Sequence, residues 1–232
     1  MQLFYNEHLS ENETNFTFDK EESRHLFKVL RKQTGDVIHV TNGKGFLFTG
    51  ELTLVSEKKC AVQITDSKFF ERKNPTICLA IAFTKSIDRI EWMLEKVTEI
   101  GISSIQPLLC ERSERNVYNE DRLQKILISA MKQSNQFWLP ELKTILPFKK
   151  FVEQAEGIKF IAHCLEEDKK ELKNCISKDS CFTIAIGPEG DFSTKEIELA
   201  IKNEFIPIAL GETRLRTETA GLVAVHTIHI CQ

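Results

Sequence analysis

The stretch from Cys181 to Ala220 constrains the fold of this chain most, because it contains two strand patterns that each run into a glycine turn. Phe182 to Ile186 is a short apolar run without alternation, which is typical of a strand covered on both faces in a parallel sheet. It ends at Gly187-Pro188-Glu189-Gly190. Phe205 to Leu210 provides the next strand, and Gly211 begins a second turn. We therefore predict two neighbouring parallel strands whose turns meet at a ligand-binding crevice.

A helix is predicted between these two strands. Ser193 stands three residues before Glu196, which is the spacing of a capping box. Ile197, Ala200 and Ile201 then fall on one side of the helix. The order strand, helix, strand is that of a parallel sheet flanked by helices.

The two turns differ in how much chemistry they carry. Glycine lets backbone N–H and C=O groups approach a ligand closely, but an isolated four-residue match is also what an ordinary strand-to-helix turn looks like. The second loop, Leu215-Arg216-Thr217-Glu218-Thr219-Ala220, brings an arginine, a carboxylate and two hydroxyls to the same crevice. That combination favours a binding site with catalytic groups.

Length and composition limit the possible classes of protein. The 232 residues allow one large domain or two modest ones, and 41% hydrophobic with 28% charged residues is typical of a globular protein. No apolar run approaches the roughly 20 residues that cross a bilayer. The N-terminal stretch lacks the basic-then-apolar layout of a signal peptide. We therefore expect a cytoplasmic protein that does not contact a membrane.

The cysteines and histidines show no metal-ligand spacing. The seven cysteines include no C-x-x-C pair and lie mostly in apolar stretches, so we expect buried free thiols rather than disulfides or zinc. His226 and His229 fall on an apolar helix, where a core or interface histidine is expected. His163 ends a predicted strand on the crevice side and is a candidate for lining the pocket.

The pattern changes near residue 72, which predicts two domains, 1–72 and 73–232. The first is β-rich with one helix over 21–31, and its strands are expected at 3–5, 36–41, 46–55 and 60–69. Short strands in about seventy residues suggest a small closed barrel. The second alternates strands and helices, with a linker at 70–75. The fold class is therefore α/β with an N-terminal β-barrel.

The last helix, from Ala220 to about Ile230, leaves hardly a polar face. A helix that is apolar nearly all round must be buried. Core packing and a subunit interface would both explain the pattern.

The charge is distributed unevenly. The chain carries −3 overall, but residues 20–73 hold eleven Lys and Arg against seven acids. Helical spacing would place His25, Lys28, Arg31 and Lys32 on a common face. This positive segment fits a surface that faces phosphates, and the alternative is a solvated lysine-rich face.

The motifs together resemble a known family, the 16S ribosomal RNA uridine-N3 methyltransferases of the SPOUT superfamily. The residues that carry the resemblance span nearly the whole chain: Arg24-His25-Leu26, Leu30-Arg31, Lys96-Val97-Thr98-Glu99-Ile100-Gly101, Arg112-Ser113, Gln133-Ser134, Ile186 to Gly190, Leu210-Gly211 and Leu215 to Ala220. The resemblance implies S-adenosyl-L-methionine as the methyl donor and 16S rRNA as the substrate, within the assembled 30S subunit. It also implies a homodimer, an N-terminal PUA-like barrel and a C-terminal domain with a trefoil knot.

The resemblance also assigns roles to residues of this chain. The residues expected at the cofactor are His163, Ile186, Gly187, Pro188, Glu189, Gly190, Leu210, Gly211, Leu215, Thr219 and Ala220. The residues expected at RNA are Arg24, His25, Arg31, Lys32, Lys85 and Arg112. Leu210 and Leu215 could each be plain core instead. Lys96 and Glu99 could be a surface ion pair.

Methylation of uridine at N3 requires that the imide proton leave while negative charge spreads to O2 and O4. Arg216 is the candidate for stabilising that charge or clamping a phosphate, since it keeps its proton. Glu218 is the nearest carboxylate that could orient Arg216 or take the proton. We predict Arg216 and Glu218 as the catalytic pair.

One segment departs from the family pattern. Phe137 and Trp138 stand where basic residues are usual, and they could stack on unpaired bases or pack against a partner subunit. Two other functions are compatible with the sequence: an inactive rRNA-binding assembly factor of the same fold, and an enzyme that binds a phosphorylated nucleotide at the first glycine turn.

Overall fold

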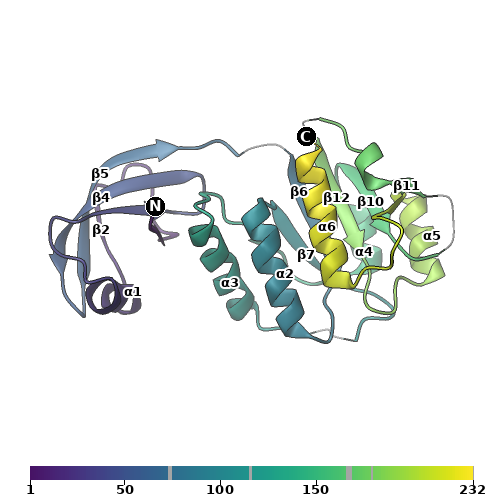
Figure 1. Ribbon diagram of the computed structural model, residues 1–232, viewed down its shortest axis with the longest axis horizontal. Coiled ribbons are helices and arrows are strands. Elements are labelled where there is room, and N and C mark those ends of the chain that lie inside the picture. The colour runs from purple at the N-terminus through teal and green to yellow at the C-terminus, as the bar shows by residue number, and fades with distance from the viewer. Residues whose placement is uncertain (73–74, 115–116, 166–168, 179, 232) are drawn as a thin grey trace. The chain divides into compact units, whose positions relative to one another are not determined.

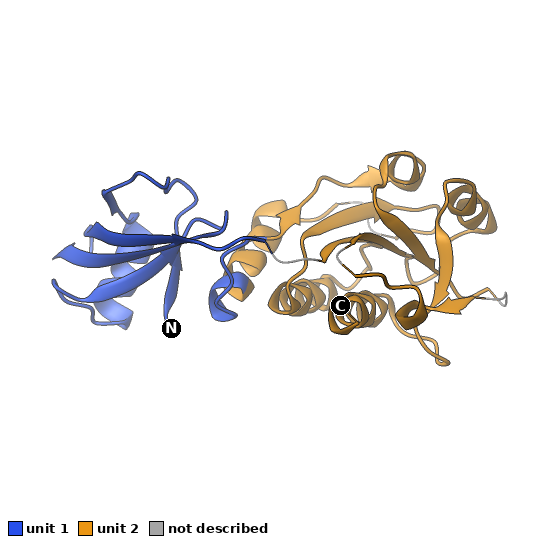
Figure 2. Cartoon of the chain, turned by 90° about the horizontal axis from the view of Figure 1, so that it is seen from above, with its two compact units in different colours: residues 1–72, 131–139 blue, residues 73–130, 140–232 orange. Residues whose placement is uncertain are grey.

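The computed structural model describes residues 1–232 except 73–74, 115–116, 166–168, 179 and 232. Contacts divide the chain into two compact units (Figure 2). Unit 1 comprises Met1–Arg72 and Met131–Leu139, and unit 2 comprises Lys73–Ala130 and Pro140–Gln232. Residues 131–139, which the sequence pattern placed in the second domain, therefore cluster with the first. Part of the predicted linker, residues 73–74, lies outside the described residues.

Unit 1 is a curved β-sheet with one short helical segment. Its elements are β1 (Leu3–Tyr5), β2 (Asn15–Thr17), α1 (Lys20–Arg24), the π-helix η1 (His25–Val29), β3 (Val37–Thr41), β4 (Phe46–Val55) and β5 (Cys60–Phe69). The order of strands in this sheet is β1-β3-β4-β5-β2. Of its pairings between described strands, β1–β3 is parallel and the other three are antiparallel. Phe4, Leu26, Phe48 and Leu52 form part of its buried core. The predicted β-rich N-terminal domain is confirmed.

The predicted helix over residues 21–31 is only partly correct. It begins at the Asp19 cap, whose carboxylate accepts the Glu22 N–H, and becomes a π-helix after Arg24. Arg31 has a φ of +51°, so it and Lys32 lie beyond the end of the helix. The predicted common helical face with His25 and Lys28 is therefore wrong.

The segment Phe137–Leu139 joins unit 1 through the main chain. Gly45 N donates to Phe137 O at 2.8 Å, and Leu139 N donates to Gly43 O at 2.9 Å. The Trp138 Nε1–H donates to Phe70 O at 2.8 Å. Both aromatic residues thus have contacts within their own chain, and stacking on bases or packing against a partner subunit stays a prediction.

Unit 2 is an α/β unit built on a parallel sheet (Figure 1). Its strands are β6 (Thr76–Ala82), β7 (Ser104–Leu109), β8 (Glu141–Leu142), β9 (Leu146–Pro147), β10 (Ile158–Ala162), β11 (Lys170–Glu171), β12 (Cys181–Ile186) and β13 (Ile206–Ala209). Its helices are α2 (Ile87–Ile100), α3 (Glu120–Gln133), which ends in unit 1, α4 (Phe148–Gln154), the 3-10 helix η2 (Leu172–Asn174), α5 (Thr194–Lys202) and α6 (Thr217–Ile230). The sheet order is β11-β13-β10-β12-β6-β7-β8, with β9 paired to β7.

The two strands followed by glycine turns are not neighbours, contrary to the prediction. β10 lies between β12 and β13 and pairs in parallel with both. Consecutive strand signals in a sequence do not reveal that an earlier strand enters the sheet between them. The consequence is functional, because the end of β10 lies between the ends of the other two strands.

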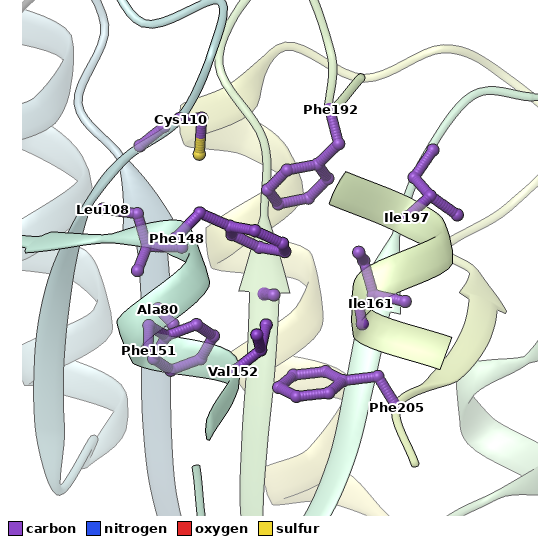
Figure 3. Close-up of a cluster of buried hydrophobic side chains, with 13 residues drawn as sticks. Ala80, Leu108, Cys110, Phe148, Phe151, Val152, Ile161, Phe192, Ile197 and Phe205 are labelled. Carbon is purple, nitrogen blue, oxygen red and sulfur yellow. The ribbon is translucent and has the colours of Figure 1, made fainter. Parts of the chain in front are cut away.

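Helices cover both faces of this sheet. α2 and α6 lie side by side on one face (Figure 1), where Gly221 of α6 lets the helix approach Ile81 and Met93. α4 and α5 cover the other face. There Phe148 lies against Phe192, with ring centroids 4.9 Å apart (Figure 3), in a core that also contains Ala80 and Ala185. Alternate residues of the central strands thus point to opposite faces of the sheet, so that Ile81 packs under α6 and Ala80 packs in the core on the other face.

The last helix begins at Thr217, three residues before its predicted start, and buries one face only. Gly221, Ala224, Val225 and Ile228 are buried, whereas His226 and His229 are exposed in the chain, as is Ile230. The single chain therefore buries one face of this helix, and the histidines are not core residues of the single chain. An interface on this helix stays a prediction.

The cysteines differ in part from expectation. All seven are free, but only Cys60 and Cys110 are buried, while Cys164, Cys181 and Cys231 are exposed. Among the residues that the structure describes, no helix has the length and apolarity to cross a membrane. No cluster of three or more potential metal ligands occurs in that same part of the chain.

A pair of glycine substitutions tests how residues 131–139 pack in unit 1. Gly35 and Gly45 both have a φ of +93°, but a Cβ on Gly45 would lie 2.6 Å from the Trp138 ring, whereas a Cβ on Gly35 would meet only Glu51 Oε1, at 4.0 Å. Gly35→Ala should cost about 1–2 kcal/mol from backbone strain alone. Gly45→Ala should cost about 1–3 kcal/mol more. Urea unfolding measures both, and equal costs would contradict the packing of Trp138 against Gly45.

Candidate functional site

A cavity of about 800 Å³ lies where β10, β12 and β13 end and α6 begins. Its walls come from four segments that are far apart in the sequence. They are Arg89; Ala162, His163, Cys164 and Lys169; Ile186 to Glu189 with Asp191; and Ile208 to Glu218 with Ala220. The predicted crevice beyond the strand ends is therefore present, and three strands rather than two contribute to it.

The first glycine turn is held tightly beneath the cavity. Gly187 and Pro188 are buried, and Asp191 N donates to Pro188 O at 2.9 Å. A Cβ on Gly187 would lie 3.0 Å from the backbone N of Phe192, so this position requires the close approach that glycine permits. The Asp191 carboxylate accepts the Cys164 N–H at 2.8 Å. This bond links the turn after β12 to the end of β10.

Side chains hold the outer side of the same turn. Glu189 Oε1 accepts the Lys85 N–H at 2.9 Å, and Gly190 O accepts from Arg112 Nη1 at 2.8 Å. Arg214 Nη2 donates to Glu189 O at 3.4 Å, which links the second loop to the first turn. Lys85 and Arg112 were expected at RNA, and both are exposed. Their observed contacts position the glycine turn.

The second loop delivers the start of α6 to the cavity. Gly211 has a φ of +136° and turns the chain after β13. Arg216 is exposed at the N-cap position, and the hydroxyl of Thr217 donates to Gly187 O at 3.1 Å. Because a helix N-terminus carries partial positive charge, Arg216 and the first turn of α6 together favour negative charge on a bound group.

Glu218 is the buried carboxylate of the site, with 7% of its surface exposed. Its Oε1 lies 3.8 Å from Arg89 Nε of α2. Within the described chain the cation beside Glu218 is thus Arg89 rather than Arg216. A buried carboxylate costs free energy unless a cation or hydrogen bond compensates it. Arg89 provides that compensation, so the predicted pairing with Arg216 is replaced.

Most of the expected cofactor residues line the cavity. They are His163, Ile186, Gly187, Pro188, Glu189, Leu210, Gly211, Leu215 and Ala220, joined by the expected catalytic residues Arg216 and Glu218. Gly190 and Thr219 do not line it. Arg24, His25, Arg31 and Lys32 belong to unit 1. Leu210 and Leu215 are half-buried, so neither is a plain core residue.

Five charged lining residues were missed by the sequence analysis: Arg89, Lys169, Asp191, Glu212 and Arg214. Asp191 follows the first glycine turn directly and could have been found from its position. Arg89 could not, because only the β12–β6 pairing brings the start of α2 beside α6. In the core cluster that includes Phe192, burial raises the pKa of the Cys110 thiol, so that side chain stays neutral.

The fold and the cavity define an α/β protein with a ligand site at the strand ends of its sheet. The RNA methyltransferase domain family matches residues 71–229, and the RNA methyltransferase PUA domain family matches residues 18–65. The chain therefore belongs to the RNA methyltransferase family, and the expected PUA-like and SPOUT-type α/β architecture is confirmed.

Individual relatives are similar to this protein over nearly the whole chain. Ribosomal RNA small subunit methyltransferase E of Synechocystis sp. is 32% identical over 224 residues, which cover 94% of this chain and 73% of that protein. The crystal structure of a probable rRNA-methyltransferase from Porphyromonas gingivalis is 34% identical with a TM-score of 0.92. The match covers 100% of this chain and 99% of that one. Ribosomal RNA small subunit methyltransferase E of Neisseria gonorrhoeae, solved bound to S-adenosyl methionine, is 28% identical with a TM-score of 0.84, covering 97% and 95%.

The bond between Thr217 and Gly187 can be tested by a single substitution. Thr217→Val keeps the side-chain shape but removes the hydroxyl that donates to Gly187 O. It should lower the free energy of unfolding by about 1 kcal/mol or more, since the buried carbonyl loses its partner. Thr219→Val, two residues further along α6, is the matched control. Equal stability of the two variants in urea unfolding would show that this bond is not needed.

Proposed function

We propose that this chain transfers a methyl group from S-adenosylmethionine to N3 of a uridine in 16S rRNA. The observation that carries the proposal is the cavity at the ends of β10, β12 and β13, which adjoins Arg216 and the buried Glu218. The small-subunit rRNA methyltransferases at 32% and 28% identity support the RNA substrate, and the bound S-adenosyl methionine in one of them supports the donor. The N3 position rests on the family resemblance.

The residues present fit this donor. A volume of about 800 Å³ lies within the range of about 300–1,000 Å³ typical of ligand sites. Ile186, Leu210 and Leu215 offer apolar surface for the adenine faces, and the backbone at Gly187 and Gly211 offers polar groups to its edge. When bound, S-adenosylmethionine would supply an electrophilic methyl group on a sulfonium.

The chain's own residues would then act on the uridine. Glu218 would accept the N3 proton, and Arg216 with the N-terminus of α6 would stabilise the negative charge that spreads to O2 and O4. Arg89 would hold the Glu218 carboxylate in place. N3 gains the methyl group as its proton moves to Glu218, and S-adenosylhomocysteine is left.

The remaining expectations complete the proposal. Residues 1–72 would form the RNA-binding domain and residues 73–232 the catalytic domain. The enzyme would act in the cytoplasm as a homodimer on the assembled 30S subunit, with a trefoil knot in its C-terminal domain. The charges of residues 20–73 support the RNA contact, and the exposed side of α6 supports a subunit interface.

The function is tested directly with purified protein, S-adenosylmethionine and 30S subunits lacking the modification. We expect incorporation of one methyl group, found as 3-methyluridine by mass spectrometry of 16S rRNA nucleosides. S-adenosylhomocysteine should displace bound donor and ATP should not. Donor binding without any methyl transfer would favour an inactive assembly factor, and competition by ATP would favour a nucleotide-binding enzyme.

Arg216 can be separated from donor binding. Arg216→Ala should lower kcat by about 10²–10³-fold, because the charge that forms on the uracil ring loses its main cation. The Kd for S-adenosylmethionine, measured by calorimetry, should not change. Arg216→Lys keeps the charge and should recover part of the activity. Normal turnover in the alanine variant would remove Arg216 from the mechanism.

Glu218 is tested by removing its charge. Glu218→Gln should lower kcat by about 10²–10⁴-fold, since an amide cannot accept the proton. Methyl transfer to 30S subunits measures kcat, and normal turnover in the variant would show that another group takes the proton.

A further inference from the structure

A second charged site lies in unit 1, at the helical segment. Glu57 Oε1 is 2.7 Å from Lys28 Nζ and 3.8 Å from Arg24 Nε, so two cations converge on one carboxylate oxygen. The hydrogen bond from Lys28 lowers the pKa of Glu57, with further contributions from Arg24 and Lys20. All three side chains of the cluster are about half-exposed or more. The arrangement holds one anionic oxygen between two cations at the surface.

The backbone keeps these groups in place. Cys60 N, just after the turn that carries Glu57, donates to the buried Ser23 hydroxyl at 2.9 Å. Within that turn, Lys59 N donates to Ser56 Oγ at 3.0 Å. The β4–β5 turn is therefore tied to α1 directly before Arg24. A preorganised pair of cations binds an anion at lower entropic cost than two flexible side chains do.

The local structure has two features common at functional sites. Lys28 lies in the π-helix His25–Val29, and π-helical turns occur frequently at such sites. Beside Lys28, Phe27 is 43% exposed and Val29 is 68% exposed. An exposed aromatic ring next to paired cations matches the chemistry of RNA recognition, in which bases stack on rings while cations contact phosphates.

Positive charge exceeds what Glu57 neutralises. Lys58 and Lys59 follow it directly and are exposed. Of the acids on α1, Glu22 lies 3.6 Å from both His25 and Lys132, and Glu21 is exposed. An exposed ion pair contributes little to stability. The convergence of Lys28 and Arg24 on Glu57 is therefore poorly explained by stability alone.

We propose that Lys28 and Arg24 form a phosphate site for RNA, that Glu57 fills it as an internal counter-ion, and that an RNA phosphate displaces the Glu57 carboxylate on binding. Phe27 stacks on a base beside that phosphate. The inference rests on the proposed RNA-binding function and adds Lys28, Glu57 and Phe27 to it. It also makes Arg24 and Lys28, rather than Arg31 and Lys32, the centre of the RNA contact in unit 1.

The test measures affinity for 30S subunits lacking the modification over a series of salt concentrations. Glu57→Gln should bind RNA about two- to fivefold more tightly, because the competing anion is gone. Glu51→Gln removes the same charge from an exposed position on β4 and is the matched control. Lys28→Ala should weaken binding and reduce the salt slope by about one. Phe27→Ala should weaken binding without changing the slope.

The outcomes separate this inference from the proposed function. If the wild-type protein binds 30S subunits and donor but Glu57→Gln behaves as Glu51→Gln and Lys28→Ala keeps its slope, the phosphate site is wrong while the function stands. If the wild-type protein does not bind 30S subunits, both fail. Circular dichroism checks folding, and should Glu57→Gln not fold, the salt slopes of Lys28→Ala and Arg24→Ala decide.

Discussion

The contact of the first glycine turn with the start of α6 is the interaction on which the candidate site depends. The Thr217 hydroxyl donates to Gly187 O, and the absent Cβ of Gly187 leaves room for the backbone of Phe192. Because Asp191 also binds Cys164 N, the ends of β12 and β10 and the start of α6 are joined within a few bonds. Without these hydrogen bonds the cavity walls would be separate loops, and ordering each of them would cost its own conformational entropy.

The charges around the cavity are arranged in pairs, and the pairing decides which group can act. Glu189 accepts from the Lys85 backbone, and Arg112 and Arg214 donate to carbonyls of the same turn. The hydrogen bonds of these three side chains therefore hold the first glycine turn in place. Glu218 has a cation from another helix at its side. Arg216 stands at the N-cap position of α6, with the helix dipole behind it. It is thus the cation that we propose meets negative charge on the substrate.

In unit 1, hydrogen bonds of the main chain twice position side chains from distant segments of the sequence. Phe137–Leu139 pairs with Gly43 and Gly45, which positions Trp138 under Phe70 O. Ser23 receives Cys60 N, which positions Glu57 beside Arg24 and Lys28. Both arrangements join residues that a sequence window treats as unrelated, and both change the role assigned to the residues involved.

Local patterns in the sequence determined the elements that depend on local physics. The unbroken apolar run of β12, the capping box of Ser193 and Glu196 and the Gly101 end of α2 follow from neighbours along the chain. Half of the lining residues of the cavity were expected from the family resemblance instead. Tertiary structure alone decided the rest: β10 between β12 and β13, Arg89 beside Glu218, and Trp138 within unit 1. The physical reason is that strand order and long-range pairing depend on free energies summed over whole faces. A short pattern records only which face a residue prefers.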